Sequence, residues 1–154
     1  MPASRNLLVT LVLPAFLIFA VPYFLVGGRL DFLGSMSESW VRMLGLPLFT
    51  VGVGLVVAGA YSAATSAGVS TGASGLNKYM RNPILLGVLI AVAAQYLLYD
   101  WPPVIAYLVV LFVVADCLIR LVVEPRLVER LGAAYQSYLD TVPRWLPKLP
   151  ARGV

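Results

Sequence analysis

Histidine is missing from this chain of 154 residues, and cysteine occurs once, at Cys117. Without histidine the chain cannot use imidazole acid–base catalysis, histidine-ligated metals or a Ser-His triad. A single cysteine excludes a disulfide framework and a cysteine-rich metal site, so we expect no metal centre. Charge is also scarce: 12% of the residues are charged and 60% are apolar. In soluble domains about 25% of the residues are charged and about 45–50% are apolar. These proportions argue against a soluble enzyme, a disordered chain and a nucleic-acid-binding domain.

Four apolar runs are long enough to form membrane helices, because a hydrocarbon core about 30 Å thick needs about 20 helical residues. The runs extend over residues 7–26, 43–65, 83–99 and 102–123. We therefore predict an all-α integral membrane protein with four transmembrane helices in a single domain. The first run is longer than the apolar core of a signal peptide, and Pro22 and Tyr23 stand where a cleavage site would lie. We expect it to be a retained helix.

Basic residues are distributed unevenly between the two sides that four spans define. One side, with both termini and the loop 66–82, holds eight: Arg5, Lys78, Arg81, Arg126, Arg130, Arg144, Lys148 and Arg152. The other side holds two, Arg29 and Arg42. The positive-inside rule then places both termini on the cytoplasmic side of the membrane. We expect this membrane to be a bacterial inner or plasma membrane. The loop 66–82 and the C-terminal segment 124–154 face the same compartment in this arrangement.

Asn82 and Pro83 mark the start of the third span. Asparagine is a strong N-cap and proline is favoured at the first helical position, so a capping role accounts for both residues. A helix start also offers free N–H groups and the positive end of the helix dipole, which suit a carboxylate or a phosphate. Arg81 stands beside this start and is able to bind the same anion. The sequence leaves the cap and the anion site open as alternatives.

Charged residues recur in the fourth span, where Asp116, Arg120 and Glu124 are spaced i, i+4, i+8. On a helix they form one stripe, and such charges usually face a protein interior or a water-filled cavity. They form either an ion ladder that orients the helix or, at Glu124, a binding site for a polar or cationic ligand. Arg120 is also able to extend to the interface instead.

Pro125 should break or bend the fourth span and start a new helix. From there apolar residues repeat at helical spacing, while charged and polar residues take the other face. The apolar positions are Leu127, Leu131, Tyr135, Tyr138 and Leu139. We predict one C-terminal amphipathic interfacial helix, which is followed by an extended segment with Trp145 at the membrane interface.

The polar blocks resemble the isoprenylcysteine carboxyl methyltransferase and phospholipid methyltransferase superfamily, especially its small bacterial integral-membrane members. These carry Arg-(His or Asn)-Pro-x-Tyr-x-Gly at a helix start, then Glu-Glu-Pro-x-Leu, a Gly, two Tyr three apart, and Val-Pro-Arg-Trp-x-Pro. The first block here is Arg81-Asn82-Pro83-Ile84-Leu85-Leu86-Gly87. The second is Val123-Glu124-Pro125-Arg126-Leu127, then Gly132, Tyr135, Tyr138 and Val142-Pro143-Arg144-Trp145-Leu146-Pro147. The resemblance covers about half of the chain, Gly75 to Leu149.

The resemblance implies S-adenosylmethionine as cofactor, in a pocket that faces the cytoplasm, and a lipophilic acceptor that enters from the bilayer. It implies Arg81, Glu124 and Arg144 as catalytic residues. It implies further cofactor contacts from Tyr79, Asn82, Pro83, Tyr135 and Tyr138, together with Glu124. Methyl transfer from a sulfonium needs alignment and a sheltered cleft more than a strong base, which is compatible with a chain that lacks histidine.

Two departures from the motifs motivate an alternative function. Leu85 stands where the family has its motif tyrosine, and Val123 replaces the first glutamate of the pair. A catalytically degenerate relative that acts as a membrane binding or scaffold protein is therefore the alternative. A small-multidrug-type transporter would have only Asp116 to couple protons, and a reductase would bind NADPH instead. Small residues in the second span, Gly45, Gly52 and Gly59 among them, would permit a homodimer.

Overall fold

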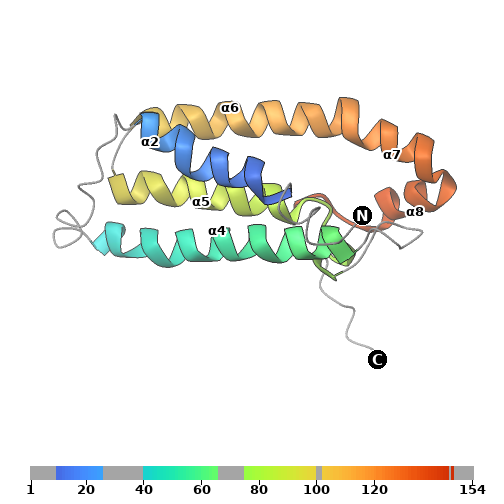
Figure 1. The fold of residues 1–154 in the computed structure, drawn as a ribbon, viewed down its shortest axis with the longest axis horizontal. Coiled ribbons are helices and arrows are strands. Elements are labelled where there is room, and N and C mark those ends of the chain that lie inside the picture. Colours follow the sequence, from blue (N-terminus) through green and yellow to red (C-terminus); the bar gives the residue numbers. More distant parts are fainter. Residues whose placement is uncertain (1–9, 26–39, 66–74, 100–101, 146, 148–154) are drawn as a thin grey trace.

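The computed structural model describes residues 10–25, 40–65, 75–99, 102–145 and 147. All regular elements within these ranges are helical, which confirms the predicted all-α class. The first helix starts at Thr10 and ends in η1 (Phe16–Ala20) and α2 (Val21–Leu25). It is followed by α4 (Trp40–Thr65), α5 (Pro83–Tyr99) and α6 (Pro102–Leu118). These four helices lie side by side along the long axis of the molecule (Figure 1).

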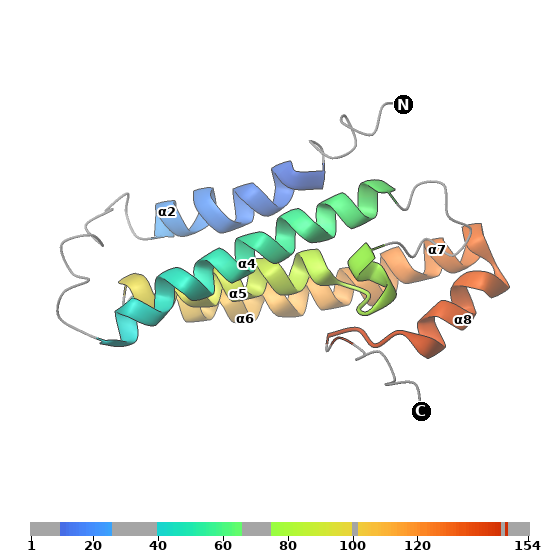
Figure 2. The same ribbon diagram turned by 90° about the horizontal axis from the view of Figure 1, so that it is seen from below.

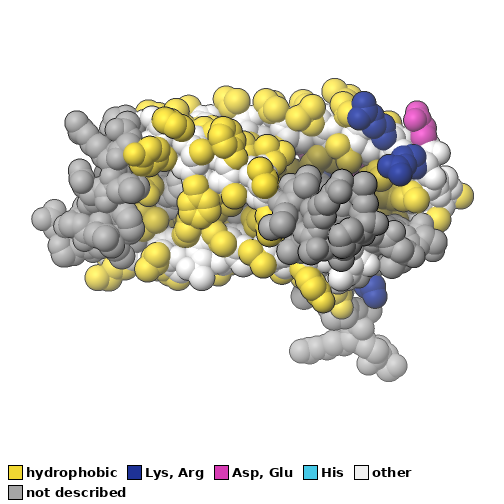
Figure 3. All heavy atoms as spheres, viewed as in Figure 1, with side chains coloured by type: hydrophobic (Ala, Val, Ile, Leu, Met, Phe, Trp, Pro, Cys, Tyr) yellow, Lys and Arg dark blue, Asp and Glu magenta, His cyan; other side chains and the backbone are white. Residues whose placement is uncertain are grey.

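Two helices are long and apolar enough to cross a membrane, Met43–Thr65 and Pro102–Leu131. The other two apolar helices, Thr10–Leu25 and Pro83–Tyr99, are shorter. Residues 7–9 and 26 of the first predicted span lie outside the described residues. The structure therefore has two helices that are able to span by length and composition, and does not by itself establish four. Hydrophobic side chains gather along the flank of the bundle (Figure 3), as a lipid-facing surface would require.

Helices α4 and α5 pack closely because glycines recur every seventh residue along α4. A Cβ added at Gly45 or Gly59 would lie 2.7–2.8 Å from side-chain atoms of Leu98 or Ile84 in α5. A Cβ at Gly52 would lie 2.6 Å from the backbone nitrogen of Ala91. The close approach that small residues permit is thus used inside the chain. The homodimer that small residues of this span would permit stays a prediction.

The chain stays helical through Pro125, so a break at this residue is wrong, whereas a new α-helical element does begin there, one residue before the predicted start. η4, a π-helical turn over Ile119–Val123, joins α6 directly to α7 (Glu124–Leu131). The Glu124 N–H donates to the carbonyl of Ile119, which is an i→i+5 bond. Proline in a regular helix clashes with the carbonyl four residues earlier. We attribute the continuity of the helix to the wider π-turn, which displaces that carbonyl.

The predicted single amphipathic helix at the C-terminal end is also wrong in its extent. Gly132, with φ +63° and ψ −143°, separates α7 from α8 (Ala133–Thr141). Glycine adopts this conformation without the steric penalty that other residues meet. Helix α8 folds back beside α7, and the segment after it returns toward the start of α5 (Figure 2). There the Arg81 N–H donates to the carbonyl of Pro143 at 3.0 Å.

The described residues of both segments predicted to face the cytoplasm, 75–82 and 124–145, lie at one end of the bundle, where α5 begins and where α7 and α8 fold back (Figure 1). The short 3₁₀ helix η3 (Gly75–Lys78) leads into α5. It is tied to the end of α4, because the Leu76 N–H donates to the hydroxyl of Ser62 at 3.0 Å. The fold thus brings residues 75–83, 116–124 and 135–145 together.

Candidate functional site

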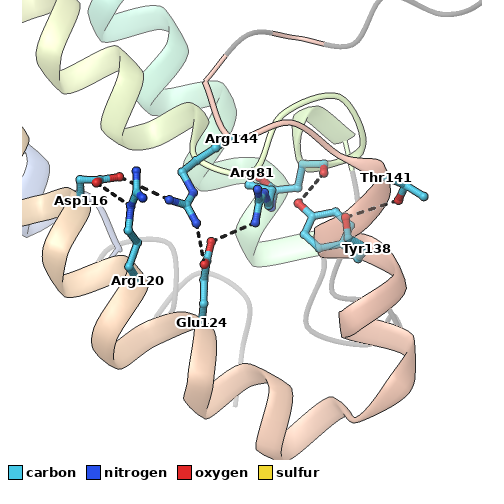
Figure 4. Close-up of polar contacts among 8 residues, drawn as sticks. Arg81, Asp116, Arg120, Glu124, Tyr138, Thr141 and Arg144 are labelled. Atoms are coloured by element: carbon cyan, nitrogen blue, oxygen red, sulfur yellow. Dashed lines mark hydrogen bonds and ion pairs between the residues drawn. The ribbon is translucent and has the colours of Figure 1, made fainter.

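Glu124 lies at the centre of a cluster of charged side chains at this end of the bundle (Figure 4). Arg81 Nη1 donates to Glu124 Oε1 at 3.1 Å, and Arg144 Nη2 donates to Glu124 Oε2 at 2.7 Å. The three side chains are 14–17% exposed. They come from the segment just before α5, from the first residue of α7 and from the segment after α8. The three residues that the sequence predicted as catalytic are therefore in direct contact.

Asp116 extends the cluster along the same helix. Its Oδ2 pairs with Arg120 Nε at 2.7 Å, and its Oδ1 lies 3.5 Å from Arg144 Nη1. Arg144 thus lies between two carboxylates, and the predicted ion ladder within the helix is present only between Asp116 and Arg120. Arg120 is 56% exposed. The cluster holds three arginines and two carboxylates, so it carries a net charge of +1.

Tyr135 and Tyr138 lie beside the cluster, with ring centroids 5.5 Å apart. Tyr135 is buried, and the Tyr138 hydroxyl donates to the carbonyl of Asn77 at 2.7 Å. Burial, and then the Glu124 charge, raise the pKa of Tyr135, against the opposite effect of Arg81 and Arg144. Burial chiefly raises the pKa of Tyr138 to about 12. Both phenols therefore stay neutral at physiological pH rather than serving as bases, and Tyr138 acts as a hydrogen-bond donor.

The remaining predicted cofactor residues lie in the segment that leads into α5 and at its first residue. Pro83 is the first residue of α5 and is buried. Asn82 precedes it, and its carbonyl accepts the Leu86 N–H at 3.0 Å, as expected of a residue that caps a helix. Its side-chain Nδ2 is buried and has no hydrogen-bond partner among the described residues. Tyr79 is 44% exposed, and its side chain is the least enclosed of the predicted site residues.

An apolar cavity of about 550 Å³ adjoins the charged cluster. It lies between the first helix, the start of α5 and the C-terminal half of α6. Asn77, Arg81 and Asn82 provide its polar lining, and Arg81 is therefore shared with the cluster. The other lining residues are apolar: Leu13, Pro14, Leu17, Ala63, Pro83, Ile84, Leu85, Val88, Leu111, Val114, Ala115, Leu118 and Ile119. The volume lies within the range of about 300–1,000 Å³ that is common for small-molecule sites.

Several buried polar atoms in the site have no partner among the described residues. They include Nε of Arg81, Nδ2 of Asn82 and Nε of Arg144, all of them donors. A buried donor without an acceptor is costly, so such groups commonly mark the place of a ligand. Donors on arginine and asparagine suit a carboxylate or hydroxyl oxygens. No group of three or more His, Cys, Asp or Glu residues in the described part of the chain is placed to hold a metal ion.

Sequence reasoning missed two features of this site. Asn77, which accepts from Tyr138 and lines the cavity, carries no local signal because its role depends on how the chain folds back. The contact of Asp116 with Arg144 was also missed. The sequence placed Asp116 and Glu124 on one stripe, but residues eight apart on a regular helix still differ by about 80°, because each residue turns about 100°. The signal was Pro125, whose conflict with a regular helix points to an irregular turn before it.

A comparison of the chain with protein-family models, with curated proteins and with solved structures finds no match in any of the three. The chemistry of the site is therefore inferred from its own residues.

Proposed function

We propose that the protein transfers methyl groups from S-adenosylmethionine to a lipophilic acceptor at the cytoplasmic face of a membrane. The observation that carries this proposal is the shared position of Arg81. It binds Glu124 in the charged cluster and also lines the apolar cavity. A polar cofactor site and an apolar acceptor site would then meet at one residue. The resemblance of residues 75–149 to integral-membrane methyltransferases points in the same direction.

The proposal includes a bilayer in which all four helices cross. Helix α5 has 17 residues, which at about 1.5 Å each give roughly 25 Å. Local thinning of the bilayer accommodates a span of this length. The outward side chains of α6 and η4 support the arrangement, since Val110 and Leu121 are 59% and 75% exposed. The cluster then lies near the cytoplasmic surface, in keeping with the distribution of basic residues.

The residues present fit S-adenosylmethionine, which would supply an electrophilic methyl group on its sulfonium. The partnerless Nε donors of Arg81 and Arg144 suit the cofactor's carboxylate. Glu124 is able to accept hydrogen bonds from an ammonium or from ribose hydroxyls. Tyr135 and Tyr138 offer aromatic surface, and Asn82 offers a free amide donor. We further propose that Pro83 and Tyr79 border this site.

The apolar cavity suits the acceptor's hydrocarbon part. Leu85, Val88 and Leu111 contribute to its wall, so a chain bound there is shielded from water. Its reacting end would lie near Arg81 and Asn82, next to the proposed cofactor site. Alignment of the two reactants in a sheltered cleft is the main contribution that such a transfer requires from the protein.

Equilibrium binding of S-adenosylhomocysteine to protein in nanodiscs tests the cofactor site. We expect saturable binding by the wild type and its loss in Glu124→Ala and Arg144→Ala. Arg120→Gln is the matched control, because Arg120 is exposed and does not contact Glu124, so its affinity should stay within threefold. Labelled methyl transfer to a total lipid extract tests the reaction. A well-folded wild type that neither binds nor transfers would refute the proposal.

A second candidate function is a membrane binding protein without catalysis. The observation that favours it is that Arg81 and Arg144 are both paired with Glu124, while Leu85 places an apolar side chain in the cavity wall where the motif has a tyrosine. This candidate predicts binding of S-adenosylhomocysteine with no transfer to any lipid. It also predicts that Glu124→Gln removes cofactor binding and leaves the cellular phenotype unchanged.

A further inference from the structure

Arg144 has two carboxylate partners at unequal distances. Its bond to Glu124 Oε2 is short, at 2.7 Å, whereas Asp116 Oδ1 lies 3.5 Å away and makes no hydrogen bond. Asp116 Oδ1 is nevertheless buried, so this acceptor is held in place with its hydrogen-bonding capacity unused. Arg144 Nε is buried without a partner as well. A small movement of the guanidinium toward Asp116 would exchange one carboxylate for the other (Figure 4).

Glu124 is able to release Arg144 and still remain paired. Its other oxygen, Oε1, accepts from Arg81 at 3.1 Å. Removing one partner of a buried ion pair is normally costly, because the other charge stays buried without compensation. Asp116 removes that cost for Arg144, and Arg81 removes it for Glu124. Oε2 of Glu124 then becomes free to accept a hydrogen bond from a ligand.

We propose that Asp116 is a positioning residue of this site, which takes over Arg144 when a ligand engages Oε2 of Glu124. The ligand is one with a hydroxyl or ammonium donor at this point. Asp116 uses its two oxygens differently: Oδ2 pairs with the exposed Arg120 at 2.7 Å, and Oδ1 is the oxygen that faces Arg144. The identity of the ligand as S-adenosylmethionine rests on the proposed function, whereas the exchange of Arg144 between the two carboxylates does not.

The exchange is tested first without any ligand. Protein labelled with ¹⁵N-arginine is placed in nanodiscs, and the Nε–H resonance of Arg144 is assigned by its loss in Arg144→Lys. Hydrogen exchange at this Nε–H reports whether the guanidinium stays buried. We expect Glu124→Gln alone to change the exchange rate less than twofold, because Asp116 then holds Arg144. In Glu124→Gln/Asp116→Asn we expect exchange at least tenfold faster, which is a non-additive effect.

Two variants separate this role from general destabilisation. Glu124→Gln/Asp116→Glu keeps a carboxylate at position 116 and should restore slow exchange to within threefold of the wild type. Arg120→Gln removes the exposed partner of Asp116 and should leave exchange within twofold. Circular dichroism must show equal helix content in all variants that are compared. If Glu124→Gln alone accelerates exchange as much as the double variant, or if the double variant does not accelerate it, the proposal is wrong.

Binding of S-adenosylhomocysteine then tests the role with a ligand. We expect Asp116→Asn to weaken binding at least tenfold, Asp116→Glu to recover most of that loss, and Arg120→Gln to stay within threefold. Unchanged affinity in Asp116→Asn would overturn the positioning role. A wild type that binds no S-adenosylhomocysteine refutes the proposed function instead, and the exchange experiment still decides whether Asp116 receives Arg144.

Discussion

Asp116 and Glu124 lie on the same side of one helix although eight residues separate them, and Arg144 contacts both. The π-turn η4 between them explains this alignment. A π-turn takes up one extra residue. Asp116 and Glu124 therefore stand as residues seven apart do in a regular α-helix, about 20° from each other at about 100° per residue. An irregularity of the backbone thus builds the charged cluster.

The π-turn makes opposite predictions for a deletion and an insertion. Deletion of the exposed Leu121, combined with Pro125→Ala, should convert η4 into regular helix and keep Asp116 and Glu124 aligned. Insertion of one alanine after Leu121 should turn one of them by about 100° relative to the other and leave them about 80° apart. We expect the thermal unfolding midpoint in detergent to fall much further for the insertion. A deletion that is as harmful as the insertion would contradict this account of η4.

Glu124 should contribute far more to stability than Arg120, the exposed residue of the charged cluster. Glu124→Gln leaves Arg81 buried without its carboxylate partner, which should lower the free energy of unfolding by about 3 kcal/mol. Arg120→Gln removes a pair whose arginine is 56% exposed and should cost less than about 1 kcal/mol. Unfolding in mixed micelles measures both variants. Equal losses of unfolding free energy in the two variants would show that the burial of Glu124 does not determine its contribution to stability.

The local elements could be predicted from the sequence better than the contacts of the site. The start of α5 was predicted from the Asn82-Pro83 signal and that of α6 from the bound of the apolar run, and both starts are confirmed. The break at Gly132 and the π-turn were missed, because a periodic pattern of apolar residues continues across both. The three contacting residues Arg81, Glu124 and Arg144 were expected at one site, but their pairing depends on the fold-back of the chain at α8.

Glycines on opposite faces of α4 should respond differently to the same substitution. At Gly52 an added Cβ would lie 2.6 Å from the backbone nitrogen of Ala91, so Gly52→Ala should destabilise the protein by about 2 kcal/mol through overpacking. At Gly54 no atom lies within 4 Å of an added Cβ. Gly54→Ala should therefore stabilise the helix by about 0.5–1 kcal/mol. Unfolding measured in one detergent compares the two, and a loss of stability at Gly54 would indicate an unrecognised contact there.

A bulky residue at position 85 should separate the acceptor site from the cofactor site. Leu85 lines the apolar cavity and does not contact Glu124. We expect Leu85→Trp to reduce methyl transfer to lipid extract at least tenfold by filling the cavity, while affinity for S-adenosylhomocysteine stays within threefold. Val109→Trp is the matched control, because Val109 is exposed and lines a separate groove. Equal loss of transfer and of cofactor affinity in Leu85→Trp would indicate that the two sites are not distinct.

The phenol of Tyr138 should make stability depend on alkaline pH. Its pKa is raised from the usual 10.0 to about 12 in the folded protein, chiefly by burial. Between these values the unfolded chain loses the proton while the folded chain keeps it. Stability is therefore fully present below pH 10 and falls as the pH rises toward 12.

Absorbance at 295 nm, taken as wild type minus Tyr138→Phe, should show one phenol that ionises near pH 12. At neutral pH, Tyr138→Phe should cost about 1 kcal/mol, because it removes the hydrogen bond to the carbonyl of Asn77. The variant should also lose stability less steeply than the wild type between pH 10 and 12, since it lacks the group that titrates. Ionisation near pH 10 would mean that the hydroxyl is open to water, and that α8 does not close over η3 as the bond to Asn77 requires.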